Sequence, residues 1–221
     1  MIHACILALT ILTTAVNADT SKYDQKISRA NEVMVEAITR EGAGIPPQLL
    51  RQCKAIMIFP GVIRAGFFWG GRFGEGITVA RTESGAWSAP AFYSVVGGSW
   101  GLQIGLESVD VVMLVMNQRG WEALLKQKFT LGADISATAG PNTASAQSDI
   151  DIALKADIVS YARARGLFAG LALNGARIAS STQTNRNFYG RDLSVDDILV
   201  RNLPPMPASA ASLMVTLSPY K

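Results

Sequence analysis

Residues 64–105 read RAGFFWGGRFGEGITVARTESGAWSAPAFYSVVGGSWGLQIG, and this stretch decides the fold. It alternates glycine with aromatic and β-branched residues, and it holds three of the four tryptophans. The alternation at residues 77–80 is typical of a half-buried strand, and residues 82–85 supply a turn in which Gly85 is free to take a positive φ. Because glycine weakens a strand, its repeated use indicates bends or close backbone approach. We expect the central meander of a small, glycine-rich, strongly curved antiparallel sheet of β-barrel-like form.

The rest of the chain offers short strands and short helices. Strands are predicted at 55–59, 109–116 and 133–139, and as two pairs within 150–164 and within 167–179, where Asn174-Gly175 forms a turn. Helices are predicted before residue 42, at 120–128 behind an Asn117 cap, and after Ser194. There is no internal repeat and no linker that would separate two domains, so residues 19–221 are predicted to form one domain.

The N-terminus carries an apolar run at residues 2–16 without a charged side chain, followed by Val16-Asn17-Ala18. Small residues at positions −3 and −1 predict a signal peptide at residues 1–18, cleaved after Ala18. The protein would then be exported, either periplasmic or secreted, and could lie peripheral to a membrane. No lysine or arginine precedes the run, which leaves an uncleaved anchor and a buried N-terminal helix as alternatives.

Charge and residue counts restrict the class of function. The formal net charge is +3, a mild excess that permits attraction to anionic surfaces but does not indicate nucleic acid as a partner. His3 and Cys5 fall within the predicted signal peptide, so residues 19–221 contain no histidine and a single cysteine, Cys53. That composition excludes a histidine-dependent nucleophile, an internal disulfide and a metal site built on histidine or several cysteines.

We therefore expect no catalytic residue, no metal and no cofactor. A hydrolase built on carboxylates alone is the remaining enzymatic alternative, although the spacing of the acids near strand ends marks no acid/base pair. Cys53 lies beside the apolar run 55–59, which favours a buried thiol over a reactive one.

The first helix of the predicted domain has two neighbouring stripes. Its apolar residues share an arc of roughly 100°, and they are Ile27, Ala30, Met34, Ala37 and Ile38. Lys22, Lys26 and Arg29 form a basic stripe beside that arc. One interpretation is a helix that covers one end of the barrel, with its basic stripe in water. The other is an interfacial helix whose apolar side enters a membrane while its cations contact anionic headgroups. The pattern alone favours the first.

Short blocks along the chain carry a resemblance to a known family. In order, they are Ile45-Pro46-Pro47, Lys54-Ala55, Arg64-Ala65-Gly66-Phe67, Arg72-x-Gly74-x-Gly76, Val79-Ala80-Arg81, Trp87-Ser88-Ala89-Pro90, Gly105-x-Glu107 with Asp110, Leu131-Gly132, Ala139-Gly140-Pro141, Arg165-Gly166-Leu167-Phe168-Ala169-Gly170 and Asn185-Arg186-x-Phe188-Tyr189-Gly190. Over nearly the whole predicted domain, this order resembles the SYLF domain family. That family is a lipid-binding domain of yeast endocytic adaptors, of animal relatives and of many bacterial exported proteins.

The resemblance implies a single α+β domain that binds anionic lipid, with phosphoinositide-type headgroups in the eukaryotic members. It also implies that the amphipathic segment ahead of the Ile-Pro-Pro block contacts the membrane, and here that segment is residues 22–40. This helix carries fewer basic residues than those of the eukaryotic relatives. Arg64 stands where those relatives usually have lysine, which keeps the charge. Since no adaptor module is attached, the actin binding of the yeast relatives is not expected here.

The resulting prediction is non-enzymatic binding of anionic lipid or of a membrane surface in the cell envelope. The candidate lipid-binding residues are Lys22, Lys26 and Arg29 on the helix, and Arg64, Arg72 and Arg81 in the family-matching blocks, where they would form a headgroup pocket. The alternative is a structural or interaction module that scaffolds a partner protein, whose identity the sequence leaves unknown.

Overall fold

The computed structural model describes residues 2–40, 42–66, 70–99, 105–164, 167–170 and 173–220. The helices are α1 (Ile2–Thr39), α2 (Pro47–Gln52), α3 (Gln118–Leu125), α4 (Gln147–Lys155), α5 (Thr182–Tyr189), α6 (Val195–Leu199), η1 (Ala208–Ala210), α7 (Ala211–Leu217) and η2 (Ser218–Tyr220). The strands are β1 (Ala55–Gly66), β2 (Gly70–Ala80), β3 (Ala91–Ser99), β4 (Gly105–Val115), β5 (Lys128–Thr130), β6 (Ala137–Ala139), β7 (Ile158–Ala164), β8 (Leu167–Gly170) and β9 (Ala176–Ser180).

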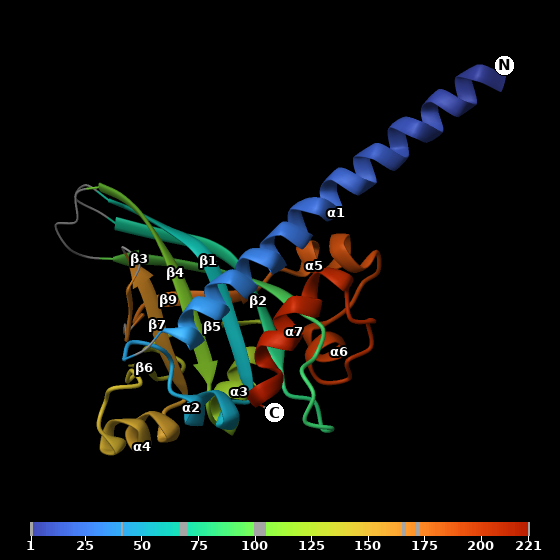
Figure 1. Cartoon of the computed structure of the whole chain (residues 1–221). Coiled ribbons are helices and arrows are strands. Elements are labelled where there is room, and N and C mark those ends of the chain that lie inside the picture. Colours follow the sequence, from blue (N-terminus) through green and yellow to red (C-terminus); the bar gives the residue numbers. More distant parts are fainter. Residues whose placement is uncertain are drawn as a thin grey trace.

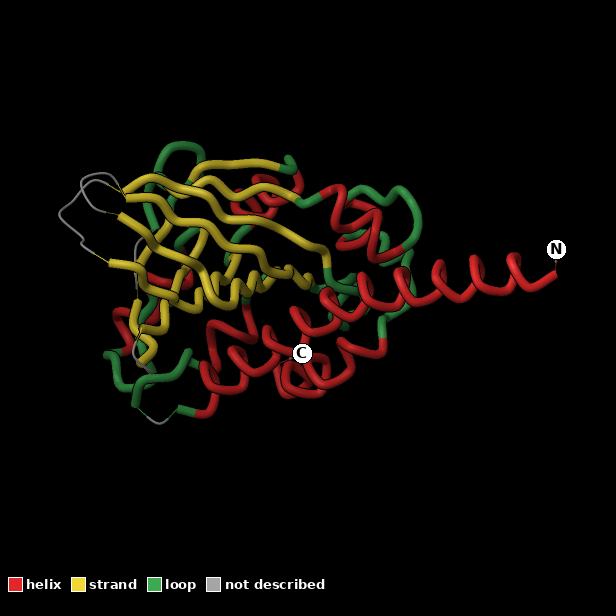
Figure 2. Tube along the Cα trace, turned by 90° about the horizontal axis from the view of Figure 1, so that it is seen from above, coloured by secondary structure: helices red, strands yellow, loops and turns green. Residues whose placement is uncertain are grey.

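The described strands form one nine-stranded sheet in the order β5-β9-β3-β2-β1-β4-β7-β6, with β8 paired to β7. The sheet is strongly curved into a half-barrel, and short helices flank it (Figures 1 and 2). This confirms the predicted α+β class and the glycine-rich meander, which is β1-β2-β3. The chain then returns across the meander, because β4 pairs with β1 rather than with β3. One pairing, β6 with β7, is parallel.

A bulge in β1 produces part of this curvature. The register of β1 shifts against both neighbouring strands around Pro60-Gly61, where Gly61 has a φ of +65°. The Gly61 N–H donates to Oδ1 of Asp110 at 2.8 Å. The other oxygen of Asp110 accepts from Nε of Arg163 at 2.7 Å, and Arg163 also forms an ion pair with Glu36 of α1. One buried carboxylate therefore fixes the bulge and joins β4, β7 and α1.

Both faces of the sheet are covered by apolar packing. On one face, α1, α2, α4 and α7 cover a core that includes Ile58, Ile77 and Phe92. On the concave face, the curled sheet itself, α3 and α6 enclose a second core around Phe59 and Tyr93. Figure 2 shows α1 and α7 lying along one side of the sheet. Such burial on both faces accounts for the near-continuous apolar run of β4.

Several local predictions are confirmed. The turn at residues 82–85 closes with Gly85 at a φ of +80°, and Arg81 bridges to Trp87 across it. The Asn117 side chain caps α3 by accepting from the Gly120 N–H at 2.9 Å. Ser194 and Asp197 form a capping box at the start of α6. These signals are local, so the sequence alone was sufficient to predict them.

Both predicted strand pairs are correct in part, and the second strand of the first pair is confirmed as β7. Residues 147–155 form helix α4 rather than a strand, because Ile150 and Ala153 are buried at a helical i, i+3 spacing while Ile152 is 63% exposed. The second pair consists of real strands, β8 and β9, and Gly175 is in a turn with a φ of +77°. They do not form a hairpin, since β8 pairs with β7 and β9 with β3.

Helix α1 continues without a break from residue 2, and its first half extends away from the rest of the domain (Figure 1). The second half, from Tyr23 onward, packs on the sheet and on α7. Within the described part of the chain, no helix combines the length and apolar character needed to cross a membrane. The signal peptide at residues 1–18 stays a prediction.

Candidate functional site

The apolar face of α1 is covered by the protein itself. Ile27, Ala30, Met34 and Ala37 are fully buried in the core that the helix shares with the sheet and α7, and Ile38 is partly buried beside them. This is the arrangement of the first sequence interpretation, a helix that covers the sheet. Any contact of α1 with a partner surface in this conformation therefore involves its flank rather than its apolar face.

The basic stripe lies on that flank. Lys26 forms an ion pair with Glu75 of β2, and its side chain is 23% exposed. Arg29 is 62% exposed and lies 4.0 Å from Glu32. The Nζ of Lys22 lies 4.9 Å from the centroid of the Tyr23 ring. The structure thus brings these three predicted residues together on one accessible edge of α1, where two of them have a carboxylate neighbour.

Arg64 and Arg72 belong to the end of the meander farthest from α2. The register pairs Arg64 with Arg72 on β2 and with Glu107 on β4. Along β2, Arg72 and Gly74 belong to one face of the sheet and Phe73 to the other. Gly74 is directly opposite Val95, which is buried. Arg72 therefore belongs to the concave face, opposite to the face that α1 covers.

Arg81 is a structural residue. Its Nε donates to the Cys53 carbonyl at 2.8 Å, and its Nη2 donates to the carbonyls of Leu50 at 2.8 Å, Arg51 at 3.0 Å and Tyr220. The guanidinium also lies 4.5 Å from the centroid of the Trp87 ring. These contacts satisfy the open carbonyls at the end of α2 and hold the C-terminal segment against it.

The three arginines of the family-matching blocks do not line one pocket. Arg72 and Arg81 are separated by nine positions of β2 and its extension, which corresponds to about 30 Å of strand. The predicted residues whose side chains the structure describes therefore lie in three places: the flank of α1, the far end of the concave face for Arg72, and the junction with α2 for Arg81.

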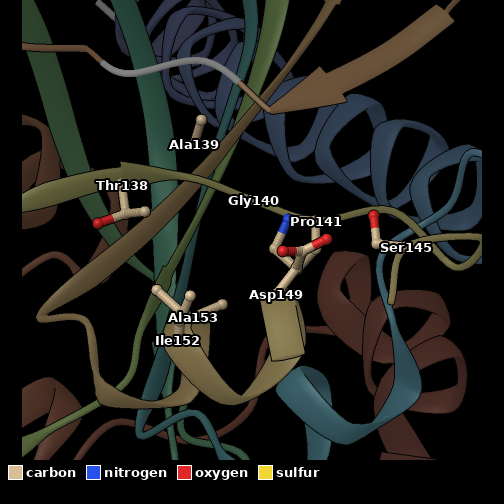
Figure 3. Close-up of a pocket in the computed structure, with 8 residues that line it drawn as sticks. All are labelled: Thr138, Ala139, Gly140, Pro141, Ser145, Asp149, Ile152 and Ala153. Atoms are coloured by element: carbon tan, nitrogen blue, oxygen red, sulfur yellow. The ribbon is translucent and has the colours of Figure 1, made fainter. Parts of the chain in front are cut away.

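Two cavities lie away from the α1 flank. One, of about 450 Å³, opens beside Arg81 and is lined by Arg51, Lys54, Glu83 and Trp121 among others. The other, of about 230 Å³, is formed by α4 and the segment after β6. Figure 3 shows Asp149 directed toward Pro141, with Ser145 beside them. This second cavity is lined by one carboxylate and no basic residue, so it does not fit an anionic ligand.

The Ala139-Gly140-Pro141 block is explained by packing. A Cβ on Gly140 would lie 2.1 Å from Cζ of Tyr161, and the Tyr161 hydroxyl donates to the Pro141 carbonyl at 2.8 Å. Burial raises the pKa of this hydroxyl well above its usual range. Tyr161 therefore acts as a buried hydrogen-bond donor that holds the loop.

Cys53 is a buried thiol, as predicted. Its side chain is fully buried, and its Sγ donates to the Leu50 carbonyl at 3.3 Å. Burial, which outweighs the nearby charge of Arg81, raises the pKa of the thiol to about 12. A thiol with such a pKa is not a nucleophile at neutral pH.

Sequence reasoning missed one exposed feature of the sheet. Core was the expected location for at least two of Phe67, Phe68, Trp69 and Phe73. Residues 67–69 lie outside the described part of the chain, while Phe73 is 53% exposed. Its neighbours across the sheet, Ile63 and Val96, are also exposed. In the sequence, Glu75 is the one charged residue of β2 on this face, and it was not used as a sign that Phe73 is exposed.

Comparison with known proteins shows similarity to one group. Residues 96–220 match the family model Ysc84, described as "Las17-binding protein actin regulator". The chain is 32% identical over 199 residues to SH3 domain-containing YSC84-like protein 1 of Rattus norvegicus and 33% identical over 199 residues to that of Homo sapiens, covering 89% of this chain and 58% of each relative. It is 34% identical over 167 residues to LAS seventeen-binding protein 3 of Saccharomyces cerevisiae, covering 74% of this chain and 36% of that protein.

The chain thus spans little more than half the length of the animal relatives. The family description and the name of the yeast relative describe binding proteins, which is consistent with a binding or interaction module.

Proposed function

We propose, from the premise that the chain belongs to the Ysc84 (SYLF) family, that it binds peripherally to an anionic lipid surface and catalyses no reaction. The observation that carries the proposal is the position of the basic stripe. Lys22 and Arg29 are exposed on the flank of α1, and the Lys26 side chain retains 23% exposure. The helix cannot offer its apolar face, which is buried, so its cations are the groups available to a headgroup layer.

The magnitude of this attraction is modest. A basic side chain near an anionic surface contributes about 1 kcal/mol, so three give about 3 kcal/mol, or roughly a hundredfold in affinity. The carboxylates of Glu75 and Glu32 reduce that value, because they partly neutralise Lys26 and Arg29. Exposed ion pairs are themselves worth only about 0.2–1 kcal/mol. A lipid phosphate can therefore replace either carboxylate at small cost.

The finer parts of the proposal concern place and headgroup. With the predicted signal peptide at residues 1–18, the domain acts outside the cytoplasm, in the periplasm or after secretion, on the surface of a membrane. The headgroup is anionic, and a phosphoinositide-type phosphate is one form of it. The alternative proposal is a module that scaffolds a protein partner, and the name of the yeast relative, LAS seventeen-binding protein 3, describes protein binding for that protein.

Vesicle co-sedimentation tests the proposal. The full chain is mixed with vesicles of neutral lipid and with vesicles that also contain an anionic lipid. Changing Lys22, Lys26 and Arg29 together to Gln is expected to weaken binding to anionic vesicles by up to about a hundredfold. Higher salt should reduce the difference, because salt screens these contacts.

A control with the same change in charge uses cations at α3 and near α6. Arg119, Lys126 and Arg201 are exposed, and their joint replacement by Gln should leave vesicle binding unchanged. The double variant Glu32→Gln with Glu75→Gln should bind anionic vesicles more tightly than the wild type. Equal binding by the wild type and the α1 triple variant would remove α1 from the mechanism and favour the protein-scaffold alternative.

A further inference from the structure

Charge alone gives the α1 flank too little affinity for stable attachment, so an apolar contribution is required, and the apolar face of α1 is buried. The remaining apolar surface beside the basic stripe is on the sheet. The inference that follows rests on the proposed function and identifies the residues that would add this contribution.

Three exposed apolar residues lie in one row across adjacent strands. Ile63 of β1 is directly opposite Phe73 of β2, and Phe73 is directly opposite Val96 of β3. Their side chains are 47%, 53% and 47% exposed, respectively. Directly opposed residues project from the same face of a sheet at close spacing. The row is therefore a continuous apolar strip rather than three scattered residues.

This strip is on the face that α1 covers and adjoins the basic stripe. Phe73, Glu75 and Ile77 alternate onto one face of β2, and Ile77 is buried in the core that contains α1. Glu75, the partner of Lys26, is two positions from Phe73, a separation of about 7 Å along a strand. The flank of α1 thus borders the strip along one side.

A second cation ends the row on the opposite side. Val96 is directly opposite Arg177 of β9, which is exposed, and Arg177 is directly opposite Thr130 of β5. The order across this surface is thus Ile63, Phe73, Val96 and Arg177, with Lys26 along the edge. Apolar side chains bordered by cations match the interface of an anionic bilayer, where acyl chains lie beneath phosphates.

We propose that the row Ile63–Phe73–Val96 inserts into the interfacial region of an anionic bilayer, while Lys26 and Arg177 contact the headgroups at its borders. The outer end of the sheet, rather than the apolar face of α1, is then the hydrophobic element of membrane attachment. The partner is a lipid surface and not a protein groove, because the strip is continuous across three strands, ends at Arg177 on the β9 side and adjoins the flank of α1 that carries Lys26.

Among the residues that the structure describes, exposed apolar side chains outside α1 and the row lack this combination. Val200, Leu203 and Met206 are exposed near α6, where Asp196 and Asp197 supply negative charge. Val215 on α7 and Ile152 on α4 are 72% and 63% exposed and come from other elements. These two residues serve as matched controls, since they have similar chemistry and exposure at different places.

The first test replaces the row. The triple variant Ile63→Thr, Phe73→Thr and Val96→Thr places threonine, which favours strands, at all three positions, and it is compared with Val215→Thr and Ile152→Thr in co-sedimentation. Burying the exposed parts of three apolar side chains predicts a loss of about a hundredfold in binding to vesicles containing phosphatidylserine. Unlike the loss caused by the α1 variant, it should persist at high salt. The two control variants should bind like the wild type.

The second test reports insertion directly and needs no triple variant. An environment-sensitive fluorophore is attached to Phe73→Cys or to Ile152→Cys in a Cys5→Ser background, since Cys53 is buried. Anionic vesicles should shift the emission to the blue for the label at position 73 and leave the label at 152 unchanged.

The outcomes separate this inference from the proposed function. Suppose that the wild type binds anionic vesicles while the emission of the label at position 73 does not shift, or while the threonine variant binds fully. Either result would overturn the insertion and leave the proposed function in place. A wild type that binds no vesicle would overturn both. If a protein partner contacts position 73 instead of lipid, and the threonine variant loses that partner, the strip would be assigned to protein binding.

Discussion

Gly76 gives the sharpest test of how the sheet is built. A Cβ added there would lie 2.1 Å from the carbonyl oxygen of Ile58 and 2.7 Å from Cδ1 of Phe59. Ordinary contact begins at 3.4 Å, so the clash with the oxygen is 1.3 Å too close. The oxygen belongs to the backbone of β1, which pairs with β2 and β4 at the centre of the sheet. It cannot move away without disturbing both ladders.

The Gly76→Ala variant should therefore lose about 3 kcal/mol of unfolding free energy, at the upper end of the usual cost of overpacking. For a domain of this size, that corresponds to a fall in Tm of roughly 6–12 °C. Gly76→Val should cost more, since two further carbons enter the same space. Thermal unfolding followed by circular dichroism measures the change.

Two glycines of the same strand complete the series. At Gly74 the nearest atom is Cγ2 of the Val62 side chain, at 2.7 Å, which can give way more easily than backbone. At Gly71 no atom of the residues that the structure describes lies within 4 Å. Alanine should thus cost less at 74 than at 76, and little or nothing at 71. A Gly76→Ala protein that melts within about 2 °C of the wild type would refute the reasoning.

Three further predictions concern single groups. Arg81→Lys should lower the unfolding free energy by about 3 kcal/mol in urea titrations, because lysine cannot reach several carbonyls at once. Unchanged stability would show that the contacts to α2 and the C-terminus are dispensable. For Asp157, burial raises the pKa, but hydrogen bonds from Ser136 and Asn117 outweigh this and leave the pKa below its ordinary value. Its contribution to stability is therefore present above pH about 4 and is lost as pH falls through the lowered pKa. In the Asp157→Asn variant, the unfolding free energy should fall less steeply as the solution is acidified. Cys53 should resist a thiol reagent at pH about 8 until the protein unfolds, given its raised pKa, and fast modification of the native Cys5→Ser protein would contradict its burial.

Local signals made much of the fold predictable. The repeated glycines of this stretch indicated close backbone approach, and a Cβ at Gly74 or Gly76 would lie 2.7 Å or less from an atom of β1. Asn117 and Ser194 read as helix caps, and both make the expected hydrogen bonds. Each of these depends on neighbours within a few residues or on the steric demands of one strand. The sequence was therefore a sufficient guide for them.

Properties that depend on distant partners could not be predicted. The alternation at residues 150–154 suits a strand as well as a helix, and the choice is made by packing of Ile150 and Ala153 in the core beside α2. Arg81 looked like a headgroup ligand, but the carbonyls it binds belong to residues 50–53 and to Tyr220. The sequence likewise did not predict that β4 pairs with β1, since this pairing requires the chain to return across the meander.

The candidate site was predictable in part for the same reason. The basic stripe of α1 follows from helical spacing, and in the structure Lys22 and Arg29 are exposed while Lys26 is partly buried against Glu75. Its relation to the exposed row on the sheet depends on the register of three strands and on which face α1 covers. Val95 and Val96 illustrate the difficulty, since both are apolar, yet the first is buried and the second is 47% exposed.

Peripheral attachment to an anionic membrane is most directly tested by the binding of the full-length wild type to phosphatidylcholine vesicles with and without phosphatidylserine, at low and at high salt. We predict strong co-sedimentation only with the anionic vesicles at low salt, and weaker but measurable binding to them at high salt, where the cations of α1 are screened and the apolar row still contributes. Equal recovery in the supernatant with both vesicle types at low salt would contradict the account.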